Sequence, residues 1–119
     1  MSRPQFTACY DRGRRYYTGL FVVFVQANQS GLWRLGLAVS RKLGGAVRRN
    51  RIRRLVREFF RLHGPEMTLP LDVVVVPKRH VDAGSLDLGA VSADLGPLLA
   101  RIRRDFGRPP REPEAEGRQ

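Results

Sequence analysis

The chain has 119 residues and a formal net charge of +11 at pH 7, which indicates a single domain with a polyanionic partner. No apolar run approaches the roughly 18 residues that cross a bilayer, and no apolar signal region follows Met1, so a membrane protein is not expected. Cys9 is the only cysteine, which excludes a disulfide framework and a Cys/His metal cluster and indicates the reducing cytoplasm. We expect a plain buried thiol at this position.

The N-terminal segment predicts a short helix over residues 2–12. Phe6, Cys9 and Tyr10 fall at i, i+3 and i+4, so two rings and the thiol share one side. These rings either dock the helix on a sheet or stay partly exposed and stack on nucleobases. The residues alone leave the two roles equally open.

Two extended segments follow the helix. Residues 16–26 are apolar on both faces, which is typical of a central strand. One face would carry Phe21, Val23 and Val25, and the other Leu20, Val22 and Phe24. The turn at 27–31 has a length that suits a hairpin, and a second strand is expected at 32–40. Small residues along one side of that strand leave room for another group to approach the sheet.

Residues 44–63 predict an amphipathic helix that carries most of the charge. Its apolar stripe repeats at three- and four-residue spacing: Ile52, Leu55, Val56, Phe59 and Phe60. Its remaining positions are nearly all arginine: Arg48, Arg49, Arg51, Arg53, Arg54, Arg57 and Arg61. Nine basic residues against Glu58 give residues 41–61 a charge of +8, and arginines four apart repel one another. We therefore expect nucleic acid as the partner, because the planar guanidinium suits bidentate phosphate contact.

The start of this helix is unusual. Gly44 and Gly45 precede it, and no Ser, Thr, Asp or Asn stands at the capping position. Open backbone N–H groups beside Lys42 and Arg48 would form a phosphate seat. The GxxxxGK[ST] pattern is absent, so nucleotide hydrolysis is not indicated.

The C-terminal half predicts one more strand and one more helix. Gly64 and Pro65 would end the arginine helix, and residues 71–77 read as an interior strand. Ser85 is the expected cap of a helix whose stripe comprises Leu88, Val91, Leu95, Leu98, Leu99 and Ile102. Gly96 and Pro97 predict a kink or a break in it. Residues 1–106 would form one domain, and 107–119 a disordered tail.

With these elements in order, the chain resembles the protein subunit of bacterial ribonuclease P over about residues 5–105. The most specific match is Arg49-Asn50-Arg51 within GGAVRRNRIRRLVREFFR, preceded by RLGLAVSRKLG at 34–44. The resemblance implies a two-layer α+β fold in αβββαβα order, with a mixed four-stranded sheet and a left-handed crossover around the arginine helix. It also supplies a fourth strand near residues 14–17, which the pattern by itself only permits.

The resemblance further implies an RNA-binding subunit of an endoribonuclease, a cytoplasmic ribonucleoprotein that removes the 5′ leader from precursor tRNA. Its RNA subunit would perform the Mg²⁺-dependent cleavage, so no catalytic residue and no metal site are expected in the protein. The contacts to the RNA subunit carry over to Ser40, Arg41, Lys42, Arg48, Arg49, Asn50, Arg51, Arg53, Arg54 and Arg57. A cleft beside the helix would hold the single-stranded leader on Phe6, Tyr10 and Phe24.

Two features depart from the family pattern. Only residues 1–5 precede Phe6, whereas the family usually has a longer basic arm before the helix that carries this ring. The resemblance therefore does not carry over the contacts of that arm, unless they have moved to Arg12, Arg14 and Arg15. Arg41-Lys42 stands where the family often has two lysines, and Phe24 where it has tyrosine, which keeps stacking but removes a hydroxyl.

Two other functions stay open. A stand-alone nuclease would use His63 or His80 as acid or base, although the carboxylates are scattered along the chain. A ribosomal or DNA-binding protein would use the same basic helix. Cleavage of precursor tRNA by the protein alone would favour the first, and equal affinity for duplex DNA would favour the second.

Overall fold

The structure is a computed structural model that describes residues 1–64 and 68–107. Its elements follow in the order α1 (Arg3–Arg12), β1 (Arg14–Tyr17), β2 (Phe21–Ala27), β3 (Arg34–Leu37), η1 (Arg41–Leu43), α2 (Ala46–His63), β4 (Leu71–Pro77) and α3 (Leu88–Phe106). The expected αβββαβα order is therefore present, with a short 3₁₀ helix added before α2. The fourth strand that the resemblance supplied is β1.

The four strands form one mixed sheet in the order β1-β2-β4-β3. β2 pairs antiparallel with both β1 and β4, and β3 runs parallel to β4 at the edge. β2 and β4 are central, as their apolar faces predicted. The hairpin expected at residues 27–31 is wrong, because β4 lies between β2 and β3. Central placement buries both faces of the valine-rich β4, so the segment 28–33 must cross its end to reach the edge.

The extended segment expected at 16–26 is two strands with a turn at residues 18–20. The Thr18 hydroxyl accepts a hydrogen bond from the N–H of Phe21 at 2.9 Å. Asp94 of α3 accepts from the N–H of Gly19 at 2.9 Å and from that of Leu20 at 3.1 Å. A carboxylate far along the chain thus holds this turn, and no local pattern predicts that contact.

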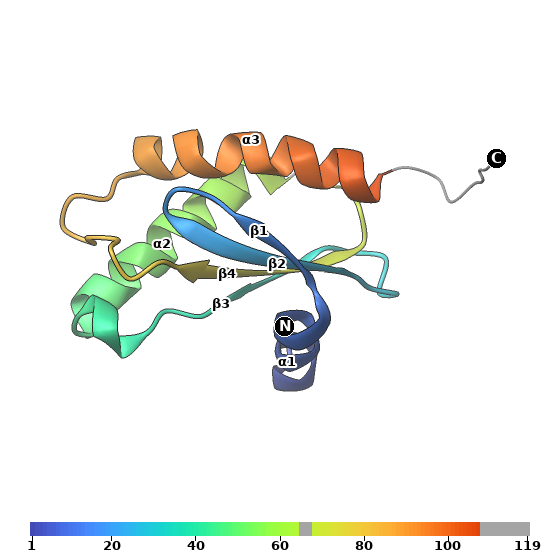
Figure 1. The fold of residues 1–119 in the computed structure, drawn as a ribbon, viewed down its shortest axis with the longest axis horizontal. Helices are drawn as coiled ribbons and strands as arrows, with labels where there is room; N and C mark the ends of the chain where they lie inside the picture. Colours follow the sequence, from blue (N-terminus) through green and yellow to red (C-terminus); the bar gives the residue numbers. More distant parts are fainter. Residues whose placement is uncertain (65–67, 108–119) are drawn as a thin grey trace.

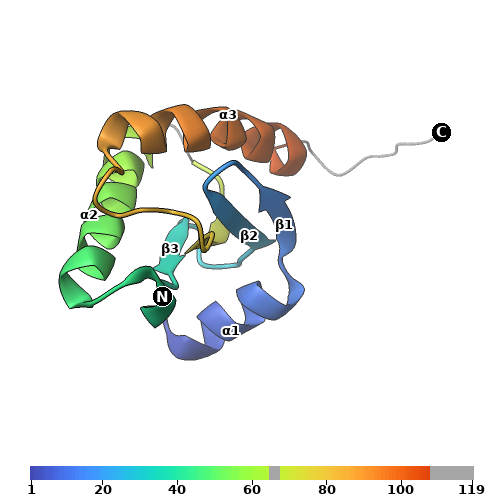
Figure 2. The same ribbon diagram turned by 60° about the vertical axis from the view of Figure 1, so that its left-hand side comes forward.

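The helices lie on both faces of the sheet (Figures 1 and 2). α2 and α3 cover one face, and their apolar stripes join Val23, Val25 and Val75 in the main core. α1 packs on the other face, where Cys9 meets Phe24 and Val74 in a second, smaller cluster. The α+β class and the mixed sheet are confirmed, but α1 adds a third, partial layer to the two that were expected. β3 and β4 are parallel neighbours joined through α2, and the left-handed sense of that crossover stays a prediction.

α3 differs from expectation at its start, and of the kink or break expected in its middle the structure rules out only the break. Asp87, not Ser85, caps it by accepting from the N–H of Ala90 at 2.7 Å. The Ser85 hydroxyl is instead part of the preceding turn, where it donates to the Asp82 carbonyl at 3.3 Å. The helix continues through Pro97 without a break, because burial of leucines on both sides of the proline outweighs one lost backbone hydrogen bond.

Gly64 ends α2 with a right-handed φ of −58°. A Cβ at this position would come within 2.8 Å of Cζ2 of Trp33, so close approach of the indole requires glycine there. The expected Pro65 stop and the tail from 108 onward fall outside the described residues. In the ranges 1–64 and 68–107, no helix combines the length and hydropathy needed to cross a bilayer.

Candidate nucleic-acid interface

The N-terminus of α2 presents open backbone donors. The Ser40 hydroxyl accepts from the N–H of Lys42 at 3.1 Å and starts η1. Gly44 follows with φ +126°, where a Cβ would lie 2.6 Å from Cδ of Arg48, so only glycine fits this turn. Gly45 caps α2 with no side-chain hydrogen bond, as the sequence predicted. The first-turn N–H groups therefore face outward beside exposed basic side chains.

Carboxylates neutralise little of the α2 arginine surface. Arg61 pairs with Glu58 at 2.6 Å, which lowers the pKa of that carboxyl, and Arg48 lies 3.6 Å from Asp82. Arg54 and Arg57 are exposed and have no hydrogen-bonding or ion-pair partner among the described residues. The self-repelling helix face expected from the sequence is therefore present in the folded chain.

Short-range hydrogen bonds hold Arg49, Asn50 and Arg53, which belong to the Arg-Asn-Arg segment and its flank. Arg49 donates from Nε to the Gly44 carbonyl at 3.3 Å, and Arg53 donates from Nη1 to Oδ1 of Asn50 at 3.0 Å. Each bond uses one N–H donor of its guanidinium and restricts the direction of the side chain, and the other donors stay available. These contacts order the basic surface before any partner arrives.

Arg51 is different, because its donors reach the main chain of a neighbouring loop. Its Nε donates to the Ala83 carbonyl at 2.8 Å and its Nη2 to the Leu86 carbonyl at 2.7 Å. The side chain is half-buried. The predicted RNA contact of Arg51 thus competes with an internal role that sequence reasoning missed, and no local signal could have revealed it.

A cleft of about 550 Å³ lies between α1, the end of β3 and α2. The residues that line it are Phe6, Tyr10, Leu37, Ala38, Val39, Ser40, Arg53 and Val76. The cleft has an aromatic wall on α1 and a guanidinium on α2. Two of the three residues predicted to hold a single strand, Phe6 and Tyr10, are therefore on it.

The aromatic residues form a layered group. The Phe6 and Tyr10 rings are 6.2 Å apart and nearly parallel at 10°, and the ring centroids of Tyr10 and Phe24 are 4.7 Å apart. Tyr10 is 44% exposed but Phe24 only 5%. Phe24 therefore lies beneath Tyr10, and its ring has little exposed surface for the direct base stacking that was predicted. One side of α1 docks on the sheet, as the first of the two N-terminal roles requires, and Tyr10 stays exposed, so stacking on a base stays a prediction.

Comparison with known proteins identifies the family. The model of the family described as Ribonuclease P matches residues 1–103. The chain belongs to the ribonuclease P protein family. It is 52% identical over 104 residues to the ribonuclease P protein component of Desulfovibrio desulfuricans, which covers 86% of this chain and 80% of that one. It is 48% identical over 103 residues to that of Oleidesulfovibrio alaskensis, covering 85% and 82%.

Solved structures of ribonuclease P proteins agree with this placement. The protein from Thermotoga maritima superposes with a TM-score of 0.76 at 34% identity, covering 84% of this chain and 93% of that one. The protein from Staphylococcus aureus gives 0.73 at 30% identity, covering 89% and 94%. The resemblance drawn from the Arg-Asn-Arg segment is confirmed, so the chain is a protein component of a ribonucleoprotein of tRNA processing.

Cys9 has a structural place in this ribonuclease P protein. It is fully buried, and its Sγ–H lies 3.3 Å from the Phe24 carbonyl and 3.4 Å from that of Asp72. Burial, helped by the nearby charge of Asp72, raises the pKa of Cys9 to about 11. The expected plain buried thiol is confirmed.

The two histidines lie on different elements of this ribonuclease P protein. His63 ends α2 with its ring 4.7 Å from that of Phe59, whereas His80 is exposed in the loop after β4. Among the described residues, no group of three or more His, Cys, Asp or Glu side chains is placed to hold a metal ion.

Proposed function

We propose that this chain binds the catalytic RNA of ribonuclease P through α2 and the loop before it, and the single-stranded leader of precursor tRNA through the adjacent cleft. The RNA subunit then performs the Mg²⁺-dependent hydrolysis, with magnesium at the RNA active site. The contact residues are those predicted from the sequence, except that Phe24 acts beneath Tyr10 and Arg51 acts through the loop. The complex belongs in the cytoplasm, where a lone cysteine stays reduced.

The position of Arg53 carries this proposal. Arg53 belongs to the arginine face of α2 and also lines the cleft. The surface suited to a folded polyanion and the groove suited to a single strand therefore share one border. One protein face can hold two RNA segments next to each other at that border.

The α2 surface and the cleft each offer chemical groups that suit the RNA proposed to bind there. Arg54, Arg57 and the open first turn of α2 offer cationic and N–H donors, which are the groups that position phosphates. In the cleft, Phe6 and Tyr10 offer ring faces on which any base stacks, so the leader is held without strict sequence reading.

Reconstitution tests the proposal directly. Ribonuclease P RNA and precursor tRNA are combined at low Mg²⁺ with and without the protein, and the cleavage rate is measured. We expect cleavage only when the RNA subunit is present, and faster cleavage when the protein is added. Cleavage by the protein alone would favour a nuclease, and equal affinity for duplex DNA would favour a DNA-binding protein.

Variants of Tyr10 test the cleft separately from the basic surface of α2. Tyr10→Ala is expected to weaken holoenzyme binding of precursor tRNA by about 1–3 kcal/mol while leaving mature tRNA unaffected, because mature tRNA has no leader to stack. Tyr10→Phe is the matched control, since it keeps the ring. Equal losses on both RNAs would mean that the ring serves folding.

A further inference from the structure

The floor of the cleft continues across the sheet to the far edge strand. Strand register places Val76 opposite Val22, and Val22 opposite Tyr17. Directly opposed residues in antiparallel strands share one face. On the other side, the N–H of Ala38 donates to the Val75 carbonyl at 3.1 Å, which continues the β3 pairing to the level of Val76. One row of side chains therefore runs from the cleft to β1.

Tyr17 is the open end of this row. It is 62% exposed, whereas Val22 and Val76 are half-buried. The three steps between four neighbouring strands span about 14 Å, so the row is long enough to continue a strand already held in the cleft. The face is the one that carries α1, because Val22 and Val76 pack against the Cys9–Phe24 cluster.

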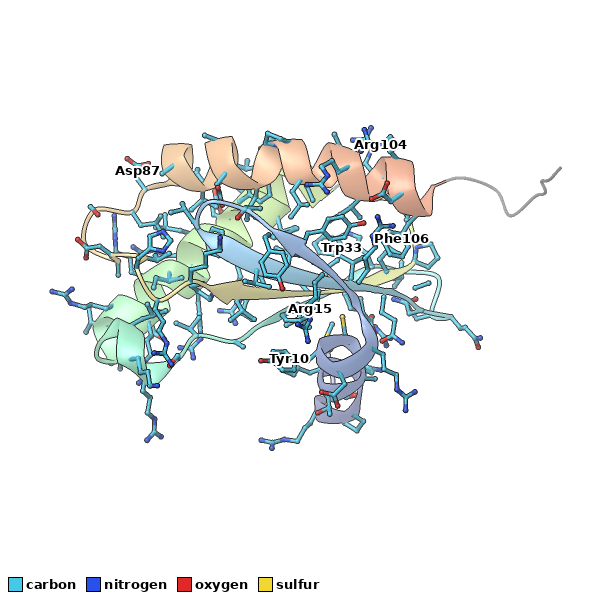
Figure 3. All side chains as sticks on the ribbon, in the orientation of Figure 1. Tyr10, Arg15, Trp33, Asp87, Arg104 and Phe106 are labelled. Carbon is cyan, nitrogen blue, oxygen red and sulfur yellow. The ribbon has the colours of Figure 1, made fainter. Side chains whose placement is uncertain are left out.

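Arg15 adds a charge beside this end. It precedes Tyr17 by two residues and so projects from the same face of β1. Its guanidinium carbon lies 5.5 Å from the Phe24 ring centroid, a cation–π contact that orients the side chain. Figure 3 shows Arg15 and Tyr10 on the α1 side of the sheet, away from Arg104 on α3. A guanidinium thus lies near each end of the row: Arg53 lines the cleft, and Arg15 lies over the Phe24 ring, two residues before Tyr17 on β1.

We propose that Tyr17 and Arg15 form a second contact site for single-stranded RNA, which takes a leader nucleotide beyond those held between Tyr10 and Arg53. Tyr17 stacks on its base, and Arg15 contacts a phosphate. A flexible polyanion with flat bases fits a surface that has a guanidinium near each end and exposed rings at Tyr10 and Tyr17. This inference rests on the proposed function, since the leader must first occupy the cleft.

The test uses the holoenzyme and precursor tRNAs whose leaders range from about 2 to about 10 nucleotides, within the usual reach of single-strand sites. Tyr17→Ala is expected to lower affinity about tenfold on long leaders, a typical effect of losing one stacked base, and not on the shortest leader or on mature tRNA. Tyr17→Phe should keep the affinity, and Leu32→Ala serves as a control at another exposed apolar residue. Arg15→Ala should lower the log–log salt slope by about 0.7, and Arg15→Lys should preserve it.

The outcomes distinguish failure of the second contact site from failure of the cleft as the leader site. If Tyr10→Ala weakens leader binding but Tyr17→Ala and Arg15→Ala do not, the second site is wrong and the cleft assignment stands. If wild-type affinity is independent of leader length and of Tyr10, the cleft assignment fails and the second site with it. A loss for Tyr17→Phe as large as for Tyr17→Ala would overturn base stacking as the contact. An unfolding transition unchanged in every variant confirms that these losses are losses of contact.

Discussion

The guanidinium of Arg51 lies against the main chain of Ala83, to whose carbonyl its Nε donates at 2.8 Å. A second bond from Nη2 reaches the Leu86 carbonyl at 2.7 Å. Arg51 thereby holds the loop that precedes α3, and Arg48 approaches the same loop through Asp82. One residue of the Arg-Asn-Arg segment is therefore a positioning residue that joins the basic helix to the rest of the fold.

We expect Arg51→Lys to destabilise the protein by about 2 kcal/mol, because lysine keeps the charge but cannot serve both carbonyls with a rigid fork. Urea unfolding measures the loss. Arg54→Lys is the matched control on the same helix, and its stability should be unchanged. Equal stability for the two variants would mean that the loop bonds are unimportant to folding.

Arg54 should behave as a phosphate contact. Its side chain is exposed and lacks a partner among the described residues, so Arg54→Ala should leave stability nearly unchanged. The log–log salt slope of binding to ribonuclease P RNA should fall by about 0.7 to 0.9. Arg104→Ala on α3 makes the same change in charge away from the interface and should not alter the slope. Weaker binding by Arg54→Ala at an unchanged slope would contradict a direct phosphate contact.

The ion pair between Arg34 and Asp72 ties the edge strand β3 to β4. Arg34 donates from Nε at 2.7 Å and from Nη2 at 3.1 Å, and Asn28 donates to the same carboxylate at 2.9 Å. Asp72 is only 5% exposed, so Arg34→Ala leaves a buried carboxylate without its main partner and should cost about 3 kcal/mol. The double variant Arg34→Met/Asp72→Asn should lose less, because no buried charge remains. The free energy of unfolding of the three proteins is measured in urea, and a double variant that loses as much as Arg34→Ala or more would contradict the penalty of an unpaired buried charge.

Stability should fall at alkaline pH through Tyr16. Its hydroxyl donates to Asp105 at 2.8 Å, and burial together with that carboxylate raises the pKa of Tyr16 to about 12. Since an unfolded tyrosine titrates near 10, the unfolded state loses its proton first, and the contribution present below pH 10 disappears between about 10 and 12. Tyr16→Phe should show a flatter decline in the free energy of unfolding over that range. The raised pKa of Cys9 adds a separate decline in the free energy of unfolding from about pH 9, and Cys9→Ala serves as the reference that lacks it. Identical curves for wild type and Tyr16→Phe would contradict the role of Tyr16.

Sequence patterns predicted the elements whose signals lie within a few residues. The strand at Leu71–Pro77 has the observed bounds, the stripe from Ile52 to Phe60 faces the core, and the cap at Gly45 is empty. The Arg-Asn-Arg segment, the RLGLAVSRKLG segment before it and the order of the elements together indicated the family. Each of these depends on periodicity, capping chemistry or a short motif, which act locally along the chain.

Long-range packing decided the rest. β4 lies between β2 and β3. The burial of both its apolar faces stabilises this order more than a direct hairpin between β2 and β3 through residues 27–31 would. The docking of α1 on the sheet covers Phe24 and leaves Tyr10 exposed. The loop after β4 brings the Ala83 carbonyl to Arg51, so this side chain bonds within the protein. By itself, then, the sequence determined most of the helices and strands, the charge and the family of this protein. Only the tertiary structure decided which side chains face a partner, because exposure depends on neighbours that are distant in the chain.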